Sequence, residues 1–178
     1  MPDKLEKQEI AINDSKEAWL CHTNEIWVRN GVRVNQMKKH QKYGGDVFEN
    51  CLDICRISPS SALIKKEVFG MVGLFDESLK VCEDYDIWLR ITAVLPIIFL
   101  DKHLIIKYGG HADQLSRLNN GIEQYRIKSL EKILRSESLS AHQSKSAKLH
   151  LLKKLKVFSN GLEKRNKLKE LSIYKKKI

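Results

Sequence analysis

Several carboxylates stand beside aromatic side chains in residues 69–90, and Glu83 and Asp84 are adjacent among them. This acidic pair lies where a helix is expected to begin. A carboxylate at that position caps unpaired backbone N–H groups and meets the positive end of the helix dipole, which is the structural explanation of the pair. The chemical explanation is that a carboxylate within hydrogen-bond reach of a hydroxyl group can remove its proton.

The residues around the acidic pair favour the chemical explanation. A cleft formed by Asp76, Glu77 and the acidic pair would offer several hydrogen-bond acceptors to sugar hydroxyls. Trp88 would add an aromatic face for a sugar ring. Such a cleft suits a polyhydroxylated acceptor.

Residues 69–90 resemble the acceptor-site motif of the inverting family 2 glycosyltransferases, which have the GT-A fold. The motif reads G-x-F-D-E-x-(L)-…-E-D-x-D-(L/I)-W-x-R, and the matching positions are Gly73, Phe75, Asp76, Glu77, Leu79, Glu83, Asp84, Asp86, Ile87, Trp88 and Arg90. By this resemblance Asp84 is the base that deprotonates the attacking hydroxyl of the acceptor. The acceptor-binding residues that the resemblance implies are Asp76, Glu77, Glu83 and Trp88.

A second segment, residues 108–117, resembles the loop that follows the last core strand in this family. In that loop a histidine completes the coordination of a divalent ion, Mg or Mn, which also binds the diphosphate of the nucleotide-sugar. The resemblance implies His111 as this ligand and places Gln114 and Arg117 in the donor-side loop. Judged from the residues alone, a single histidine in a polar loop is more often an exposed side chain, because a metal site needs several convergent ligands.

The resemblance covers only part of the family's domain. Family members carry an Asp-x-Asp motif for the metal and the nucleotide, usually followed by a Trp-x-Pro-x-Lys-Leu-Glu-x-Gln helix, and residues 2–8 resemble that helix. The one D-x-D in this sequence, residues 84–86, lies inside the acceptor motif. The match therefore spans residues 2–120 and predicts the carboxyl-terminal half of a GT-A domain, with the nucleotide-binding half missing from a truncated chain.

Length and composition are those of a globular chain. With 178 residues, of which 42% are hydrophobic and 30% charged, the chain can bury a sizeable core. No apolar run approaches the roughly 20 residues that span a bilayer, and the first residues lack the apolar core of a signal peptide. These features and the four irregularly spaced cysteines predict a cytoplasmic protein.

Cys51 and Cys55 allow two interpretations. A C-x3-C pair could join His22 or His40 on a zinc ion. The spacing also places both cysteines near Phe48 on one helical face, so two small buried hydrophobic residues are the favoured interpretation.

The net charge of +10 is concentrated at the carboxyl-terminal end. Residues 122–178 hold 16 Lys and Arg against 5 Asp and Glu, whereas the first 121 residues hold 16 against 17. This change, together with the Asn119-Asn120-Gly121 break, predicts a glycosyltransferase-like part in residues 1–120 and a basic helical extension in residues 121–178. Because no aromatic residues are interleaved with the lysines, a solvated helix face or a contact with anionic membrane phosphates is favoured over nucleic-acid binding.

Sequence periodicity predicts mixed α/β structure, and the resemblance implies a partial GT-A-like (Rossmann-like) mixed sheet with flanking helices and a basic α-helical extension. Expected helices cover residues 2–11, 46–55, 67–72, 84–94, 122–134, 141–158 and 162–174, with Gly161 separating the last two. Expected strands cover residues 18–28, 62–64, 97–100 and 104–108, the last two as short strands or a hairpin, and residues 29–46 are expected to form a long loop.

Three functions fit these observations. The first, and by resemblance the ancestry of the chain, is a family 2-like glycosyltransferase that moves a sugar from a nucleotide-sugar to a glycan or lipid-linked acceptor. Its activity in this chain stays open, because the Asp-x-Asp motif is lacking. The second is a non-catalytic glycan-binding remnant that uses the same cleft. The third is a basic helical adaptor that binds an anionic membrane surface through residues 122–178.

Overall fold

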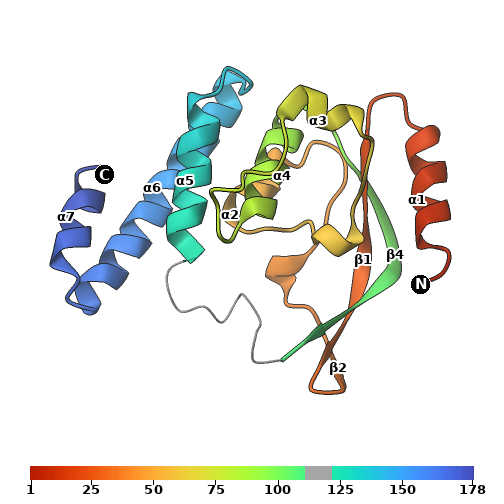
Figure 1. The fold of residues 1–178 in the computed structure, drawn as a ribbon, viewed down its shortest axis with the longest axis horizontal. Helices are drawn as coiled ribbons and strands as arrows, with labels where there is room; N and C mark the ends of the chain where they lie inside the picture. The colour runs from red at the N-terminus through yellow and green to blue at the C-terminus, as the bar shows by residue number, and fades with distance from the viewer. Residues whose placement is uncertain (111–121) are drawn as a thin grey trace.

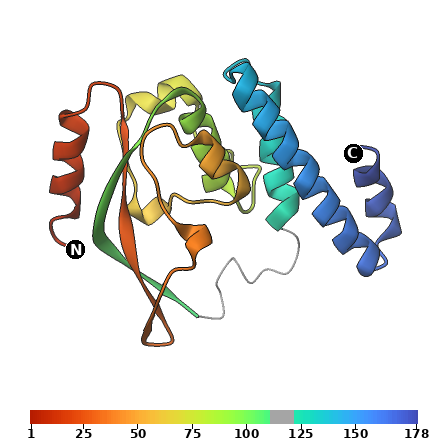
Figure 2. The same ribbon diagram turned by 180° about the vertical axis from the view of Figure 1, so that it is seen from behind.

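The protein is a mixed α/β molecule in which helices cover both faces of one sheet, and the computed structural model describes residues 1–110 and 122–178. The elements in chain order are α1 (Lys4–Asn13), β1 (Leu20–Arg29), β2 (Val32–Val34), η1 (Lys38–His40), α2 (Phe48–Asp53), η2 (Pro59–Ser61), β3 (Leu63–Ile64), α3 (Glu67–Val72), α4 (Glu83–Val94), β4 (Ile98–Gly109), α5 (Ile122–Arg135), α6 (Ala141–Lys164) and α7 (Leu168–Lys175). Figure 1 shows α1 on one side of the sheet, α2, α3 and α4 on the other side, and α5, α6 and α7 beyond them. Figure 2 shows the same order of layers from behind. The predicted mixed α/β class is confirmed.

The sheet is built around β1. β4 runs parallel to β1 along one edge of that strand. On the other edge β3 pairs antiparallel with the start of β1, and β2 pairs antiparallel with its end. The turn between β1 and β2 contains Asn30 and Gly31, both with positive φ, as a tight hairpin turn requires. The predicted long loop over residues 29–46 therefore contains a short strand and the η1 turn.

β4 is one long strand, and the prediction of two short strands or a hairpin was wrong. The polar residues Asp101 and Lys102 do not interrupt it, because the register against β1 shifts there: Leu100 pairs with Thr23, and His103 pairs with the next residue, Asn24. An irregularity of this kind lets a strand continue while it re-aims its side chains. The polar run is exposed on the outer edge of the sheet.

α1 is fixed to the sheet by a buried polar side chain. Gln8 is fully buried, and its amide group donates hydrogen bonds to the carbonyl oxygens of Cys21, at 2.8 Å, and Ser61, at 2.9 Å. Ile12 is buried on the same side, whereas Leu5 is exposed. The helix therefore docks by a narrow contact at its carboxyl-terminal half.

α4 is the central helix of the core. Tyr85, Trp88 and Leu89 share one helical face and are buried, which explains why this segment forms a helix against the sheet. The helix ends at Val94, and the extended backbone of Leu95 precedes Pro96, which cannot continue a helix.

The same core continues into the carboxyl-terminal helices. Leu130 and Ile133 of α5 belong to the buried cluster that includes Trp88. α6 begins with a capping box in which Ser140 and Gln143 bind each other's backbone N–H groups. It then runs through Gly161, so the predicted helix boundary at that glycine was wrong. The predicted division of the chain at residue 120 falls outside the described residues and stays a prediction.

No helix in the described ranges is long and apolar enough to cross a membrane.

Candidate functional site

Asp84 lies in the first turn of α4, where the chain turns sharply into the helix. The preceding Cys82 has a left-handed backbone, with φ of 65°, and bounds the helix. Asp84 Oδ1 accepts a hydrogen bond from the Tyr85 backbone N–H at 2.7 Å, and Oδ2 lies 3.2 Å from Cys55 Sγ. The side chain is half-buried. The carboxylate is therefore fixed at a helix N-terminus while part of it stays open to solvent.

The Cys55 thiol is the donor in its contact with Asp84. Burial raises the pKa of Cys55 well above its ordinary value, and the negative charge of Asp84 raises it further. The thiol therefore stays protonated. Its Sγ also lies 3.3 Å from the Ile57 carbonyl oxygen, so its single proton is shared between two acceptors.

Arg90 fastens the loop after α3 to α4. Its guanidinium group donates hydrogen bonds to the carbonyl oxygens of Val72, Gly73 and Leu74, the last at 2.9 Å. The same group lies 2.8 Å from the Asp86 carboxylate. Gly73 ends α3 with φ of 81°, a conformation that strains other residues. These members of the motif have a structural role.

Lys132 of α5 joins two carboxylates of the motif. Its Nζ lies 2.7 Å from Asp76 Oδ2 and 3.1 Å from Asp86 Oδ2. Asp76 also accepts hydrogen bonds from the backbone N–H and the hydroxyl of Ser78. Hydrogen bonds from Lys132 and Ser78 lower the pKa of Asp76 to about 2. Asp76 thus holds its turn against α5, and its acceptor-binding role stays a prediction.

The carboxylates of Glu77 and Glu83 are not bound by other residues in the described part of the chain. Glu77 is exposed and Glu83 is half-buried. No hydrogen bond or ion pair joins either carboxylate to another residue in the described part of the chain. Their position beside the start of α4 leaves them able to meet a ligand, and their acceptor-binding role stays a prediction.

Trp88 lies in the hydrophobic core and is 2% exposed. Its ring reaches no surface, so this position does not support the interpretation of Trp88 as the aromatic wall of an acceptor cleft. The physical reason is the helical spacing of Trp88 with Tyr85, because both residues lie on the buried face of α4.

A second group of polar side chains lies toward the carboxyl ends of the parallel strands β1 and β4. Glu25 is 3% exposed and accepts a hydrogen bond from the Trp27 indole N–H at 2.7 Å. Lys42 Nζ lies 3.6 Å from the other carboxylate oxygen of Glu25. Lys107 of β4 places its Nζ 3.4 Å from Ser58 Oγ and 5.6 Å from the centre of the Trp27 ring. We call Glu25, Trp27, Lys42 and Lys107 the strand-end cluster.

The strand-end cluster was missed in the sequence analysis. Burial alone would raise the pKa of Glu25, but Lys42 and the Trp27 N–H group hold that pKa below its ordinary value. Burial lowers the pKa of Lys42, and Glu25 opposes this effect. A charged residue such as Glu25 inside an expected strand is the signal that could have revealed the cluster.

Residues 55–58 connect the strand-end cluster to Asp84. At one end of this segment Cys55 contacts Asp84. In its middle the Arg56 carbonyl oxygen accepts a hydrogen bond from Lys42 at 3.1 Å, and at its other end Ser58 contacts Lys107. The two groups of side chains therefore lie on either side of one four-residue segment. In open α/β sheets, ligands bind beside the carboxyl ends of parallel strands, which is where this segment lies.

The described residues do not by themselves fit a metal ion. Among residues 1–110 and 122–178, no group of three or more His, Cys, Asp or Glu side chains could hold one. Cys51 is buried in the core and Cys55 contacts Asp84, which accords with their interpretation as small buried residues. The predicted donor-side residues His111, Gln114 and Arg117 lie outside the described residues. A site for Mg or Mn thus stays a prediction of the resemblance.

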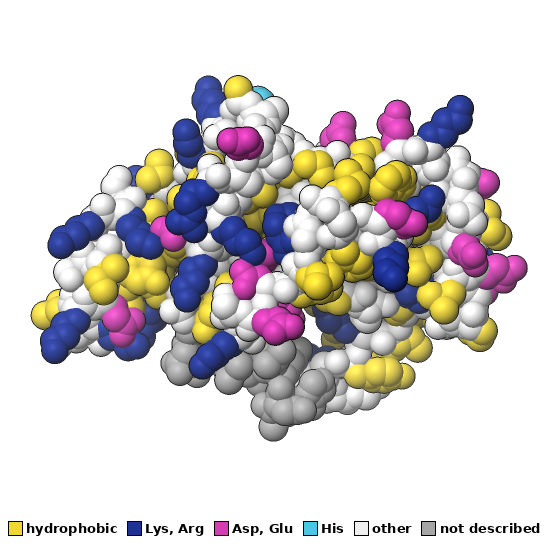
Figure 3. Space-filling model, turned by 45° about the horizontal axis from the view of Figure 1, so that its top comes forward, with side chains coloured by type: hydrophobic (Ala, Val, Ile, Leu, Met, Phe, Trp, Pro, Cys, Tyr) yellow, Lys and Arg dark blue, Asp and Glu magenta, His cyan; other side chains and the backbone are white. Residues whose placement is uncertain are grey.

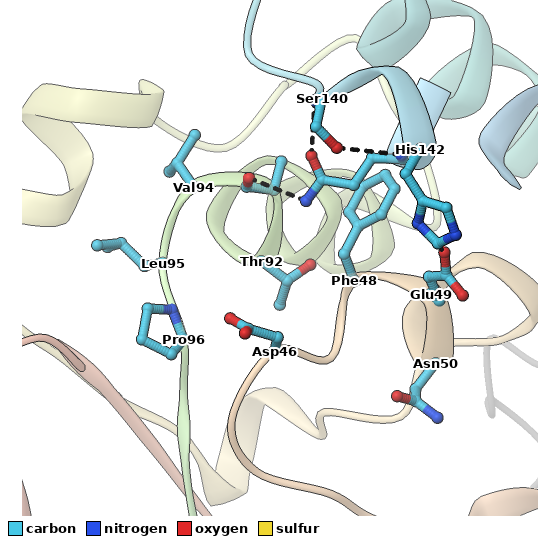
Figure 4. Close-up of a pocket in the computed structure, with 12 residues that line it drawn as sticks. Asp46, Phe48, Glu49, Asn50, Thr92, Val94, Leu95, Pro96, Ser140 and His142 are labelled. Carbon is cyan, nitrogen blue, oxygen red and sulfur yellow. Dashed lines mark hydrogen bonds and ion pairs between the residues drawn. The ribbon is translucent and has the colours of Figure 1, made fainter. Parts of the chain in front are cut away.

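A separate pocket lies at the opposite end of α4. Figure 4 shows it between the end of α4, the start of α2 and the start of α6, and its volume is about 430 Å³. At its rim His142 Nδ1 lies 3.0 Å from Glu49 Oε1, and Gln143 donates a hydrogen bond to the Ala93 carbonyl oxygen. Because these polar groups pair with one another, we place the candidate site at Asp84.

Curated relatives of this chain are uncharacterised glycosyltransferases of Rickettsia. One from Rickettsia prowazekii is 31% identical over 130 residues, which are 70% of this chain and 41% of the relative. One from Rickettsia felis is 40% identical over 121 residues, which are 65% of this chain and 20% of the relative. One from Rickettsia bellii is 42% identical over 121 residues, or 65% of this chain and 17% of the relative.

These similarities support a relation to glycosyltransferases in general. The chain spans less than half the length of each of these relatives. No protein-family model matches the chain, and no solved structure matches it at a significant level.

Proposed function

We propose that this chain is the acceptor-side part of an inverting family 2 glycosyltransferase with a GT-A fold. It acts with a nucleotide-sugar donor and a glycan or lipid-linked acceptor. The observation that carries the proposal is the Asp84 carboxylate, which a backbone N–H group and a thiol hold at the N-terminus of α4. The similarity to Rickettsia glycosyltransferases supports it independently of this geometry.

In the proposed reaction Asp84 takes the proton from an acceptor hydroxyl as the oxygen of that hydroxyl attacks the anomeric carbon of the donor. The new carbon–oxygen bond forms while the bond from that carbon to the diphosphate oxygen breaks, and the configuration is inverted. The nucleoside diphosphate leaves with the electron pair of the broken bond. The proton remains on Asp84.

The surroundings of Asp84 suit this role. Each carboxylate oxygen has two lone pairs, so one protein donor on each oxygen leaves an acceptor site for the substrate hydroxyl. The hydrogen bond from Arg90 to the Leu74 carbonyl oxygen and the ion pairs of Lys132 with Asp76 and Asp86 hold the loop between α3 and α4 in one conformation. A fixed base loses less entropy when the reacting groups come together.

The test is transfer of a radiolabelled sugar by the protein purified from its own cells together with the chain that supplies the nucleotide-binding half. UDP-glucose, UDP-N-acetylglucosamine and GDP-mannose serve as donors, and envelope glycolipids from the same cells serve as acceptors. Wild-type protein should label the acceptor. The Asp84→Asn variant, which keeps the shape and the backbone hydrogen bond, should lose at least about a hundredfold in rate, the usual contribution of a general base.

The matched control is Asp14→Asn, which removes an exposed carboxylate at the end of α1 and should leave the rate unchanged. Wild-type turnover in Asp84→Asn would remove the base assignment. Saccharide binding without transfer from any donor would instead favour the non-catalytic glycan-binding remnant.

A second function is favoured by the outer face of α6. Leu149 is 53% exposed and Val157 is 64% exposed, and exposed lysines surround them. These lysines are Lys145, Lys148, Lys153 and Lys156. Apolar side chains that insert between lipids and lysines that meet anionic headgroups are the features of a helix that binds at a membrane surface. We propose that this face brings the site to an anionic membrane.

A further inference from the structure

An open apolar groove lies between α3 and the loop that follows it. Its volume is about 540 Å³, within the usual range for small-molecule sites, and it is lined by Lys66, Glu67, Phe69, Gly70 and Leu74. Leu74 is 73% exposed, and Phe69 is half-buried. Single apolar side chains on a surface are ordinary, but apolar side chains that line one hollow indicate a binding site.

Gly70 keeps this groove open. It lies inside α3, and its φ is outside the left-handed region, so its backbone does not require a glycine. A Cβ at this position would meet no atom within 4 Å beyond its own stretch of helix in the described part of the chain, so no close neighbour requires a glycine either. Glycine destabilises a helix relative to alanine. The space that it leaves is therefore better explained by a ligand than by folding.

The wall of the groove that belongs to the loop is held in place. Arg90 donates hydrogen bonds to the carbonyl oxygens of Gly73, at 3.2 Å, and Leu74, at 2.9 Å. The Phe75 ring, which follows in the loop, lies 6.3 Å from the Phe69 ring, measured between ring centres. A preformed wall loses little conformational entropy when a ligand binds. The groove is thus ready to receive an apolar group.

The groove and Asp84 lie at two places along α4. Arg90, which binds the Leu74 carbonyl oxygen, follows Asp84 by six residues, or about 9 Å along the helix axis. Asp76 and Glu77, the predicted acceptor-binding residues, follow Leu74 in the same loop. A lipid-linked saccharide has a hydrocarbon chain at one end and hydroxyl groups at the other. One such molecule could therefore occupy the groove and present a hydroxyl to Asp84.

A hydrocarbon chain matches this groove better than a free sugar or a protein partner does. The side chains of Phe69 and Leu74 form no hydrogen bonds, so a free sugar unit there would lose those that it makes with water. Five residues line the groove, whereas a stable protein interface takes about 20 to 30 residues on each side. The exposed Lys66 can cover a chain with its methylene groups while its charge stays in water.

We propose that this groove holds the hydrocarbon chain of the acceptor, so that the acceptor is lipid-linked and is not a free glycan. The proposal rests on the function proposed for Asp84 and names the class of its acceptor. It also agrees with the membrane contact proposed for α6, because a lipid-linked acceptor lies in a membrane. Figure 3 shows apolar side chains over α3 on the same face of the molecule as Lys and Arg side chains of α5, α6 and α7.

The test follows the Phe69 ring by fluorine-19 NMR of protein that contains 4-fluorophenylalanine. The chain has five phenylalanines, and the Phe69→Tyr variant identifies the Phe69 signal by its loss. Glucose and its butyl, hexyl and octyl glucosides are added below the concentrations at which micelles form. Octyl glucoside should shift the Phe69 signal in a saturable way, while the signal of the core residue Phe158 stays in place. The affinity should rise about fourfold for each methylene group that becomes fully buried.

Two variants at exposed positions test the groove. Gly70→Leu should fill it and weaken octyl glucoside binding at least about tenfold, and the fold should be kept because leucine favours a helix and its Cβ meets no neighbour. Leu74→Ser should weaken binding about tenfold, as expected when a buried leucine contact is lost. Met71→Leu, at the next position of α3, and Leu168→Ser, on α7, are matched exposed controls and should bind as wild type does.

A Phe69 signal that octyl glucoside leaves in place would overturn the proposal, and so would equal affinities of Gly70→Leu and Met71→Leu. Equal affinities for glucose and octyl glucoside would also overturn it, because the chain would then contribute nothing. A wild-type dimer in analytical ultracentrifugation that Gly70→Leu dissociates would assign the groove to a second copy of the protein instead.

The failure of this proposal is distinct from the failure of the proposed function. Transfer that depends on Asp84 but labels a water-soluble glycan as readily as a glycolipid, without binding of octyl glucoside at Phe69, refutes only the lipid-linked acceptor. Binding of octyl glucoside that Gly70→Leu weakens, without transfer from any donor, refutes only the enzyme.

Discussion

Asp84 and Asp86 are two residues apart on α4, so their side chains point to different sides of the helix. Asp84 meets the Cys55 thiol and is partly open to solvent. Asp86 is buried between Arg90 and Lys132. The motif thus supplies one carboxylate that is partly open to solvent, which is the proposed base, and one that stabilises the loop leading to it.

We expect Asp86→Asn to lower the free energy of unfolding by about 3 kcal/mol, because it leaves Arg90 and Lys132 without their shared buried charge. Urea unfolding at pH 7 measures this loss. Glu77→Gln, which changes an exposed carboxylate in the same motif, should stay within about 0.5 kcal/mol of wild type. Equal stabilities of the two variants would contradict the structural role of Asp86.

His22 makes the stability depend on pH. Burial lowers its pKa to about 4, although the Tyr43 carbonyl oxygen, which lies 2.8 Å from Nε2, opposes this shift. The unfolded chain takes up a proton near pH 6.5 and the folded chain does not, so the stability present above pH 6.5 is lost as the pH falls towards 4. The loss approaches about 1.4 kcal/mol per pH unit inside this window.

Urea unfolding at pH 7.0, 6.0 and 5.0 tests this expectation. His22→Gln should flatten the dependence on pH, whereas His103→Gln, which changes an exposed histidine, should keep it. If both variants show the slope of wild type, another group is responsible.

At the scale of single residues the sequence predicts the element in which a residue lies better than it predicts which distant residues that residue contacts. The acidic pair was expected at a helix start, and α4 begins at Glu83. The contact of Asp84 with Cys55 joins residues 29 apart, and local patterns do not indicate it. Glu25 and Lys42 meet only because β1 and the segment after η1 fold together. Trp88 was expected to border an acceptor cleft, but it is buried at helical spacing with Tyr85.

At the scale of elements, strong apolar periodicity predicts helices and their ends well. α3 and α4 match their expected ranges closely. In α4 buried residues recur at helical spacing, and Pro96 stops the helix. β4 differed from its prediction because it pairs with β1 on both sides of Asp101 and Lys102, so these polar residues stay inside one strand. α6 differed because burial of Phe158 and Leu162, on either side of Gly161, outweighs the low helix propensity of glycine.

The position of Gly161 inside α6 gives a test of that explanation. Gly161→Ala should raise the free energy of unfolding by about 0.5 to 1 kcal/mol, because alanine favours a helix more than glycine does. The added Cβ would lie 3.2 Å from the guanidinium group of Arg165, which is the movable end of a long side chain. Thermal unfolding measures the gain, and Lys156→Ala on the same helix, a change between two good helix formers, should be near neutral. A clear loss of stability in Gly161→Ala would contradict the helical packing.

At the scale of the whole molecule, positive charge gathers at one end. Figure 3 shows Lys and Arg side chains spread over the part formed by α5, α6 and α7. Residues 122–178 carry a net charge of +11 and the rest of the chain −1, yet several lysines of this part pair with acidic side chains. The outer face of α6 is where exposed lysines and exposed apolar side chains coincide.

The four lysines of that face should control membrane binding. Changing Lys145, Lys148, Lys153 and Lys156 together to Gln should reduce sedimentation with phosphatidylserine vesicles at least about tenfold, since each lysine near such a surface contributes about 1 kcal/mol. Raising the salt concentration from about 0.05 M to 0.5 M should release the wild-type protein. Four exposed lysines elsewhere, Lys16, Lys38, Lys39 and Lys102, form the matched control. Binding that ignores salt, or equal losses in the two variants, would refute a role for this face.

The pairing of β1 with β4 also sets the order in which the molecule can fold. β1 ends at Arg29 and its parallel partner begins at Ile98, so the central strands of the sheet meet only after a long loop has closed. Such closure loses entropy before the new contacts stabilise it, which makes folding slow. During synthesis the edge of β1 that later pairs with β4 keeps its backbone N–H and C=O groups unpaired. A chaperone would protect the nascent chain at this unpaired edge, and aggregation would start there.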